Sequence, residues 1–283
     1  MKLKILSPPL LFLLIISCNT TEKIKNDLEF YKLEGNVKSL KEFTFNTIEK
    51  NGEITKGDLD ETRDISHMKF DRNGNIIEKI TYHRDFYFKK ILTYDENGNE
   101  LEQIYYKSDG ILDSKEIPKY DEKGNKIESN RYKSDGSLDS KSIMKYDEKG
   151  NKIESNRYKS DGSLDSEVTF QYDEKGNMIE YRFKGIVGYF TFLKIIYKYD
   201  KNDNLIEKTS YDLDRGDSLN YRTTYRYNEN DNKIEEYEYD KEGRLKHRLN
   251  YEYEYDQKGN WIKKIKFDHK FRPTITERDI EYY

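Results

Sequence analysis

The side chains that could bind a metal ion are spread along the whole chain and are not gathered in one motif. The turns at 71–75 and 200–204 alternate Asp and Asn with other residues, but an EF-hand loop needs glycine at its sixth position and a bidentate glutamate at its twelfth. Ile76 and Tyr82 stand at those positions in the first turn. A zinc site needs three or four converging ligands, and the four histidines occur singly: His67, His83, His247 and His269. We therefore expect no metal and no cofactor, with divalent-ion binding by stacked turns as the alternative.

Acid–base and nucleophilic catalysis are not indicated either. The chain contains no Gly-x-Ser-x-Gly motif, phosphate-binding glycine loop or nucleotide fingerprint. Its carboxylates recur at the same place in successive repeats, which suits solvated cross-strand partners of lysine better than one tuned active site. We expect a protein that is not an enzyme; a glycosidase would require an unusual carboxylate pair in a cleft.

Cys18, the only cysteine, is the one residue for which the sequence indicates a covalent modification. A basic start and the apolar run Leu10–Ile16 precede it, and this run is too short to span a bilayer. Ile15-Ile16-Ser17-Cys18 is typical of a bacterial lipobox, which is cleaved between Ser17 and Cys18 so that the cysteine receives a diacylglyceryl thioether. We expect a lipoprotein signal peptide at 1–17, an N-terminal tether at 18–30 and a repeat domain at 31–283. An ordinary signal peptide that contains a cysteine is the alternative.

Several acyl chains on Cys18 would hold the protein firmly at a membrane. We expect a lipid-anchored protein of the cell envelope, in the outer membrane, with the periplasmic and external faces both left open.

Lys and Arg (51) nearly balance Asp and Glu (55) and are interspersed with them, so no basic stripe is present for nucleic acid. Only 34% of the residues are hydrophobic, which argues against a thick three-layer α/β core.

A repeat of about 26 residues fills most of the chain. Each copy starts with an aromatic residue, usually followed by Asp, two polar residues, Gly or Asp, and an invariant Asn. The nine starts are Tyr31, Phe70, Tyr94, Tyr120, Tyr146, Tyr172, Tyr199, Tyr227 and Tyr255. A fixed period of this kind is a sign of a repeat architecture.

Each repeat contains two turns, which leave two strands of eight to nine residues between them. Asp147-Glu148-Lys149-Gly150 shows the pattern: Asp suits the first position of a type I turn, and Gly supplies the positive φ of a three-residue hairpin loop that ends in a bulge. Alternation along the strands puts the start tyrosines on one face. The aliphatic residues seven positions after each start lie on the other face: Ile77, Leu101, Ile127, Ile153, Ile179, Ile206, Ile234 and Ile262.

The predicted fold is all-β, an antiparallel β-hairpin repeat array of nine repeats. Eighteen strands about 4.8 Å apart would make a sheet about 85 Å wide, and twisted sheets of more than about ten strands tend to curl or split. We expect a curled or spiral meander with one face inward. A flat single-layer sheet is the alternative.

The string YDEKGNKI, at 120–127 and again at 146–153, resembles the YD repeat of the RHS family. The resemblance covers about 31–272. It implies a β-shell, which in large RHS proteins encloses a toxin domain; the invariant Asn, where the family more often has Arg, and the small number of repeats argue against a toxin-delivery role here. The chain is also similar to repeat lipoproteins of Bacteroidota-type bacteria that carry LEGNVKSL near the mature start, here at 33–40.

Three segments depart from the repeat. The most apolar run of the mature chain, Phe183–Tyr197, is either an exposed interaction patch, with Tyr189, Phe190 and Phe192 at its centre, or local core. The polar insertion at 51–64 suits a surface loop. Trp261, at a position otherwise held by residues such as Lys, Glu or Ile, is either a core plug or a stacking platform for a sugar.

These features predict a lipid-anchored, non-enzymatic repeat protein of the envelope that offers an extended surface for protein partners, because repeat arrays make long contact surfaces. A glycan-binding module is the alternative, since aromatic rings serve as sugar platforms. An envelope glycosidase or a toxin-associated RHS-like protein fits the sequence less well.

Overall fold

The computed structural model describes residues 26–283 except 62, 64 and 186–191. Ser17, Cys18, Tyr189 and Phe190 therefore lie outside the described residues. One short helix and nineteen strands make up the described chain. They are α1 (Asp27–Phe30), β1 (Val37–Lys50), β2 (Glu53–Leu59), β3 (Ile65–Phe70), β4 (Ile76–His83), β5 (Phe86–Tyr94), β6 (Glu100–Tyr106), β7 (Leu112–Tyr120), β8 (Lys126–Lys133), β9 (Leu138–Tyr146), β10 (Lys152–Lys159), β11 (Leu164–Tyr172), β12 (Met178–Gly185), β13 (Phe192–Tyr199), β14 (Leu205–Asp212), β15 (Ser218–Tyr227), β16 (Lys233–Asp240), β17 (Leu245–Tyr255), β18 (Trp261–Asp268) and β19 (Thr274–Tyr282).

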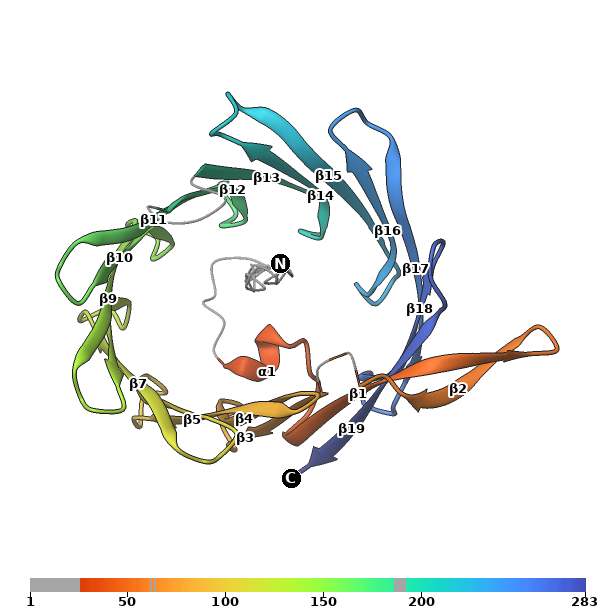
Figure 1. Ribbon diagram of the computed structural model, residues 1–283, viewed down its shortest axis with the longest axis horizontal. Helices are drawn as coiled ribbons and strands as arrows, with labels where there is room; N and C mark the ends of the chain where they lie inside the picture. Colours follow the sequence, from red (N-terminus) through yellow and green to blue (C-terminus); the bar gives the residue numbers. More distant parts are fainter. Residues whose placement is uncertain (1–25, 62, 64, 186–191) are drawn as a thin grey trace, which may run out of the picture.

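The strands form a closed ring (Figure 1). Each strand from β3 to β19 pairs antiparallel with the next along the chain, and β1 closes the ring by pairing with β19 on one edge and β3 on the other. Eighteen strands thus make an antiparallel β-barrel meander, while β2 pairs with β1 and projects from the ring. The predicted all-β meander with one face inward is confirmed, but the predicted spiral is wrong because β1 pairs with both β19 and β3 and closes the ring. The flat single-layer sheet is wrong, because closure pairs the two edges that an open sheet would leave exposed.

The insertion at 51–64 is not the predicted loop. Residues Glu53–Leu59 form β2, which pairs with the far half of β1 through a turn at Asn51 and Gly52. Both turn residues have positive φ, 54° and 82°. Asn-Gly is a strong signal for a two-residue hairpin turn, and it explains why a strand forms here.

The predicted turn chemistry is confirmed at the repeat starts. In the turn after Tyr146, the Asp147 N–H donates to the Asn151 carbonyl (2.9 Å) and the Gly150 N–H donates to the Asp147 carbonyl (3.1 Å), with Gly150 at φ 84°. The Asn151 side-chain amide donates to the Asp147 carboxylate at 2.9 Å. The same amide-to-carboxylate bond occurs in four other turns, which gives the invariant asparagine a structural reason.

Two turns carry aspartate where the others have glycine. Asp203 and Asp231 hold this place at φ 64° and 53°. Their carboxylates accept bonds from the preceding turn, from the amides of Asn177 (2.9 Å) and Asn204 (2.7 Å) respectively. Each aspartate therefore links consecutive repeats, which a glycine cannot do.

The start tyrosines line the inside of the ring and connect successive hairpins. Their hydroxyls donate at 2.8 Å to backbone carbonyls about twenty residues earlier, as in Tyr146 to Lys126, Tyr172 to Lys152 and Tyr227 to Leu205. Burial raises the pKa of the Tyr227 hydroxyl to about 12.

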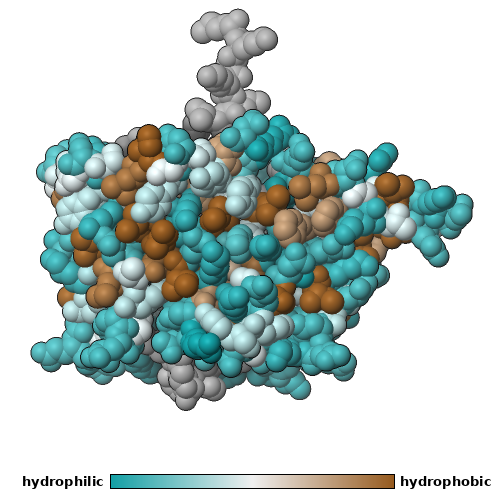
Figure 2. Space-filling model, turned by 90° about the horizontal axis from the view of Figure 1, so that it is seen from below, coloured by the Kyte–Doolittle hydropathy of each residue, from teal (hydrophilic) through white to brown (hydrophobic). Residues whose placement is uncertain are grey.

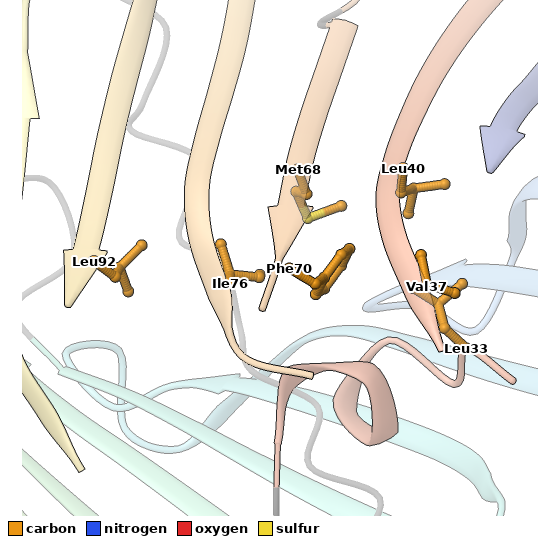
Figure 3. Close-up of a cluster of buried hydrophobic side chains, with 7 residues drawn as sticks. All are labelled: Leu33, Val37, Leu40, Met68, Phe70, Ile76 and Leu92. Carbon is orange, nitrogen blue, oxygen red and sulfur yellow. The ribbon is translucent and has the colours of Figure 1, made fainter. Parts of the chain in front are cut away.

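A hydrophobic cluster on the inner face holds α1 inside the ring (Figure 3). Its buried members are Leu33, Val37, Leu40, Met68, Phe70, Ile76 and Leu92. Leu28 and Tyr31 pack against them from α1 and its C-terminal end. The Leu28 N–H also donates to the Gly74 carbonyl (3.2 Å), and the Asp27 carboxylate accepts from the Ile76 N–H (2.6 Å).

Rows of alternating charge cover the outer face. Glu128 accepts from Lys119 on one side (2.8 Å) and Lys141 on the other (2.7 Å), and these lysines hold the pKa of its carboxyl at about 2. Glu78 lies between two lysines, and Glu207 lies between a lysine and an arginine, in the same way. Figure 2 shows hydrophilic and hydrophobic side chains interspersed over one side of this wall. The repeated glutamate is thus a cross-strand partner of cations, as predicted.

Candidate binding site on the inner wall

The interior of the ring is too wide for side chains to fill. Eighteen strands about 4.8 Å apart enclose a ring at least about 27 Å across between backbones, and barrels of 16–18 strands leave a water-filled lumen. Because α1 packs on the tyrosine face from inside the ring, every second residue along the strands lines this interior. The wall that these residues form is the inner wall.

The residue types on the inner wall change between most repeats, whereas those on the outer wall recur. Eight positions after the start, on the outer face, Glu recurs in seven copies. Six positions after the start, on the inner face, the residues are Ile76, Glu100, Lys126, Lys152, Met178, Leu205, Lys233 and Trp261. Nine positions after the start, also inside, they are Lys79, Gln103, Ser129, Ser155, Tyr181, Lys208, Glu236 and Lys264. Constant positions serve the shared hairpin, so the variable ones give the inner wall its individual chemistry.

One sector of the inner wall is apolar. On β12–β14 the buried residues are Met178, Tyr181, Ile195, Tyr197 and Leu205. Phe183 and Leu193 pack against this cluster, so the described part of the apolar run at 183–197 contributes to local core on its inward side. Phe192 lies on the opposite face, half-buried, with the Lys184 ammonium 5.5 Å from its ring centroid.

A second sector, on β16–β19, combines cations with aromatic rings. We call it the lysine–aromatic cluster and define it by these residues: Lys233, Tyr251, Tyr253, Trp261, Lys264 and Arg278. The strand register creates it, because Tyr253 on β17 lies opposite Lys264 on β18, which lies opposite Thr276 on β19. Directly opposed residues point to the same face of a sheet.

Trp261 is half-buried within this cluster. The Arg278 guanidinium lies 3.5 Å from its ring centroid and the Lys264 ammonium 4.7 Å, while Tyr253 meets it edge-to-face at 6.1 Å. Arg278 also binds Glu42 on β1 at 2.9 Å, and the Arg278 side chain is only 8% exposed. Trp261 is therefore packed among cations in the wall, an arrangement closer to the plug than to a bare stacking platform.

Lys264 differs from the other cations of the cluster in its partners. Lys233 pairs with Glu236, and Arg278 pairs with Glu42, but no ion pair found among the described residues includes Lys264. Burial lowers the pKa of Lys264 to about 8; Glu42 opposes this shift, and the neighbouring cations Arg278, Lys233 and Lys266 add to it. An ammonium without a carboxylate partner, held in a wall beside other cations, favours an anion.

A second inward cation lies on β10, far from this cluster along the wall. The Lys152 ammonium is 5.1 Å from the Phe170 ring centroid, and burial, with a smaller effect of Lys126, lowers its pKa. Lys126 itself pairs with Glu100 at 3.5 Å. Cations beside aromatic rings are thus a recurrent feature of the inner wall.

The grooves of the outer wall are less distinctive. A groove of about 680 Å³ lies at the seam of β19, β1 and β3, and its lining includes Lys38, His67, Lys69 and Glu281. Lys38 and Lys69 already have carboxylate partners, Glu281 and Glu78.

Among the residues that the structure describes, no group of three or more His, Cys, Asp or Glu side chains is placed to hold a metal ion. None of the helices in this part of the chain is long and apolar enough to cross a membrane.

No protein-family model matches the chain, and no curated protein matches it. A porin-like protein from Bacteroides uniformis is similar in structure, with a TM-score of 0.43 and 10% identity over 87% of this chain and 96% of that one. A porin-like protein from Bacteroides vulgatus gives a TM-score of 0.34 and 12% identity over 87% and 98% of the two chains. A chain of the Photorhabdus luminescens Tc holotoxin pore gives 0.33 and 13% over 72% of this chain, which spans only 14% of that one. The chain is thus structurally similar to porin-like proteins and to part of Tc toxin chains, while no family model supports the sequence resemblance to YD repeats.

Of the residues that the sequence singled out, the described ones do not meet in one place. Phe192 faces outward on β13, and Trp261 lies on the inner wall of β18. Sequence reasoning missed Lys264 and Arg278, which surround Trp261. The signal was present in the repeat alignment, where the inward positions change between most copies while the outward position holds glutamate in seven of nine.

Proposed function

We propose that the protein is a lipid-anchored, non-enzymatic binding protein of the cell envelope, and that the inner wall of the barrel is its binding surface. The observation that carries this proposal is the contrast between an outer wall of repeated Lys–Glu rows and an inner wall whose side chains change between most repeats. A surface selected for one ligand needs individual side chains, whereas a surface that only keeps strands paired in water does not.

The same contrast supports a glycan over a protein partner. A folded protein would contact the outside of the barrel, where salt bridges already occupy the charges. An extended polar chain suits a lined interior about 27 Å across between backbones, whose wall offers hydroxyls, cations and aromatic rings. A scaffold for protein partners, bound through the outer wall and through the segment around Phe192, remains the second candidate.

The lipid on Cys18, and not the barrel wall, is proposed to hold the protein at the outer membrane. A lipid-facing barrel carries an outward apolar band about 25 Å tall, and one Lys or Arg at mid-membrane costs about 2–4 kcal/mol. Exposed lysines cross the outer wall here: Lys119, Lys145 and Lys198 have side chains 62%, 62% and 64% exposed. These rows support a wall that faces water.

Cys18→Ala should therefore move the protein from the membrane fraction to the soluble fraction and abolish labelling by a clickable fatty acid. Cys18→Ser, which also lacks the thiol, should behave in the same way and serves as the matched control for the substitution itself. Retention of Cys18→Ala in carbonate-washed membranes would show that the wall, not a lipid, contacts the bilayer.

The binding surface is tested by two matched triple variants of the lipidated protein on a glycan array. Lys152→Ala, Lys208→Ala and Lys264→Ala together remove three inner cations, and Lys119→Ala, Lys145→Ala and Lys198→Ala together remove three outer ones. We expect the inner variant to lose at least tenfold in affinity for its glycan and the outer variant to bind as the native protein does. Loss of binding in the outer variant alone would place the surface outside and favour the protein-partner candidate. An array without any signal would remove the glycan class.

A further inference from the structure

Within the proposed inner-wall function, on which this inference rests, we propose that the lysine–aromatic cluster binds the anionic group of an acidic polysaccharide, a uronate carboxylate or a sugar sulfate, with Lys264 as its donor. The cluster lies where β16–β19 and β1 meet, close to the seam of the barrel. In this sector a cation, hydroxyls and aromatic rings share one stretch of wall.

The strand register supplies the geometry. Lys264 is opposed by Tyr253 on one side and Thr276 on the other, and the hydroxyl of Thr276 is 3.1 Å from that of Thr44 on β1. Lys266, one inward position further along β18, is opposed by Tyr251 and Thr274. A sugar unit that lies along this wall would meet an aromatic ring, an ammonium and a hydroxyl in sequence, which is the mixture that sugar-binding surfaces need.

The charge of the cluster favours an anion. Its three cations are Lys233, Lys264 and Arg278, and Lys266 lies beside them on β18. The acidic groups that face these cations are Glu236, Glu42 and Asp268. Glu236 is engaged by Lys233 and by the Tyr251 hydroxyl (3.2 Å), and Glu42 is engaged by Arg278 (2.9 Å). Lys264 is thus left in the wall with repelling neighbours and with no ion-pair partner among the described residues. A carboxylate or sulfate of the ligand would serve here as the ion-pair partner of Lys264.

Arg278 has a positioning role in this site. Its guanidinium lies on the Trp261 ring at 3.5 Å and is held by Glu42, so its charge is largely compensated. The indole in turn borders the Lys264 ammonium at 4.7 Å. Trp261 and Arg278 therefore fix where the free ammonium points.

The pH dependence of binding follows from the state of Lys264. Its ammonium attracts an anion only while it is protonated, and its pKa in the free protein is about 8. The attraction is therefore complete below about pH 7 and declines as the pH rises through 8. A surface lysine, with an ordinary pKa near about 10.4, would show no decline until about pH 10.

The test is calorimetric titration of the full lipidated protein in detergent with three hexasaccharides: galacturonate, sulfated galactose and neutral galactose. We expect at least one acidic hexasaccharide to bind at least tenfold tighter than the neutral one, and the stronger of the two identifies the acid. Lys264→Met should lower that affinity at least tenfold, and the native affinity should fall about tenfold from pH 7 to pH 9. Lys264→Arg should keep the affinity at both pH values because arginine stays protonated.

Equal binding of acidic and neutral sugars would overturn the inference, and so would an unchanged affinity in a folded Lys264→Met variant. Lys198→Met, which removes a lysine of the outer wall, is the matched control and should leave the affinity within about twofold. Lys152→Met removes a second inner cation, on β10, and tests the position of the site along the inner wall. If Lys152→Met lost binding and Lys264→Met did not, the site assignment would be wrong while the inner-wall function would stand. If neither variant changed the affinity and neither acidic hexasaccharide bound tighter than the neutral one, this inference and the inner-wall function would both be wrong.

Discussion

Replacing Phe70 by alanine should lower the free energy of unfolding by about 3–5 kcal/mol, the range for removing a buried phenylalanine from a packed core. The Phe70 side chain is 1% exposed and lies in the cluster that joins β1, β3, β4 and β5 to α1 (Figure 3). This cluster sits beside the seam, so a cavity there weakens the packing of α1 and the closure of the ring together. Urea denaturation followed by circular dichroism measures the loss.

Ile77→Ala is the matched control for this substitution. Ile77 lies seven residues along the chain on the outer face and is 37% exposed, so its truncation should change the unfolding free energy by less than about 1 kcal/mol. If Phe70→Ala and Ile77→Ala had equal effects, α1 and its cluster would not be part of the stable core.

Replacing Arg278 by methionine should destabilise the barrel by about 2–4 kcal/mol. Arg278 on β19 and Glu42 on β1 form an ion pair at 2.9 Å across the seam, with the arginine side chain 8% exposed. Methionine fills a similar volume but leaves the Glu42 carboxylate half-buried without its cation, and breaking a buried pair in this way is strongly unfavourable. The partial exposure of Glu42 places the effect below that of a fully buried pair.

Arg226→Met tests the same chemistry away from the seam. Arg226 binds Glu235 at the same distance, 2.9 Å, but its side chain is 71% exposed. Exposed pairs contribute about 0–1 kcal/mol, so this variant should be nearly as stable as the native protein in the same urea experiment. An Arg278→Met variant as stable as Arg226→Met would show that the seam does not depend on this pair.

The local structure was predictable because each repeat encodes its own hairpin. Asp147 and Gly150 specify the turn, and period-two alternation from Tyr146 separates the inner tyrosines from the outer aliphatics. The tyrosine row is inward and Ile127 and Ile153 are among the exposed hydrophobic residues, as the alternation predicts. The asparagine at the sixth position was visible as a constant, but its bond to the Asp147 carboxylate became evident only from the geometry.

Closure was not predictable because no repeat specifies it. Val37 pairs with Tyr282 across almost the whole chain length, and nothing in the 26-residue pattern distinguishes a ring from a spiral. Strand tilt and twist decide whether the ends meet. The β2 hairpin was predictable from Asn51-Gly52, but the polar composition of the insertion pointed to a loop.

The candidate site was predictable only in part. Trp261 stood out as the single tryptophan, whereas Lys264 is one of many lysines and gains its character from position. Its surroundings are set by Arg278, which belongs to a different strand and lies outside the nine-fold pattern. The sequence shows that Trp261 is unusual, but only the strand register shows which side chains it contacts.

Because β1 pairs with β19 and closes the ring, the number of repeats determines the diameter of the barrel. Duplicating one internal repeat would insert two strands without touching either closing strand, which would add about 10 Å to the circumference and about 3 Å to the diameter. In an open solenoid the same duplication would only lengthen the molecule. Gene-level gain or loss of whole units could therefore adjust the calibre of the lumen stepwise, while point substitutions on the inner face adjust its lining.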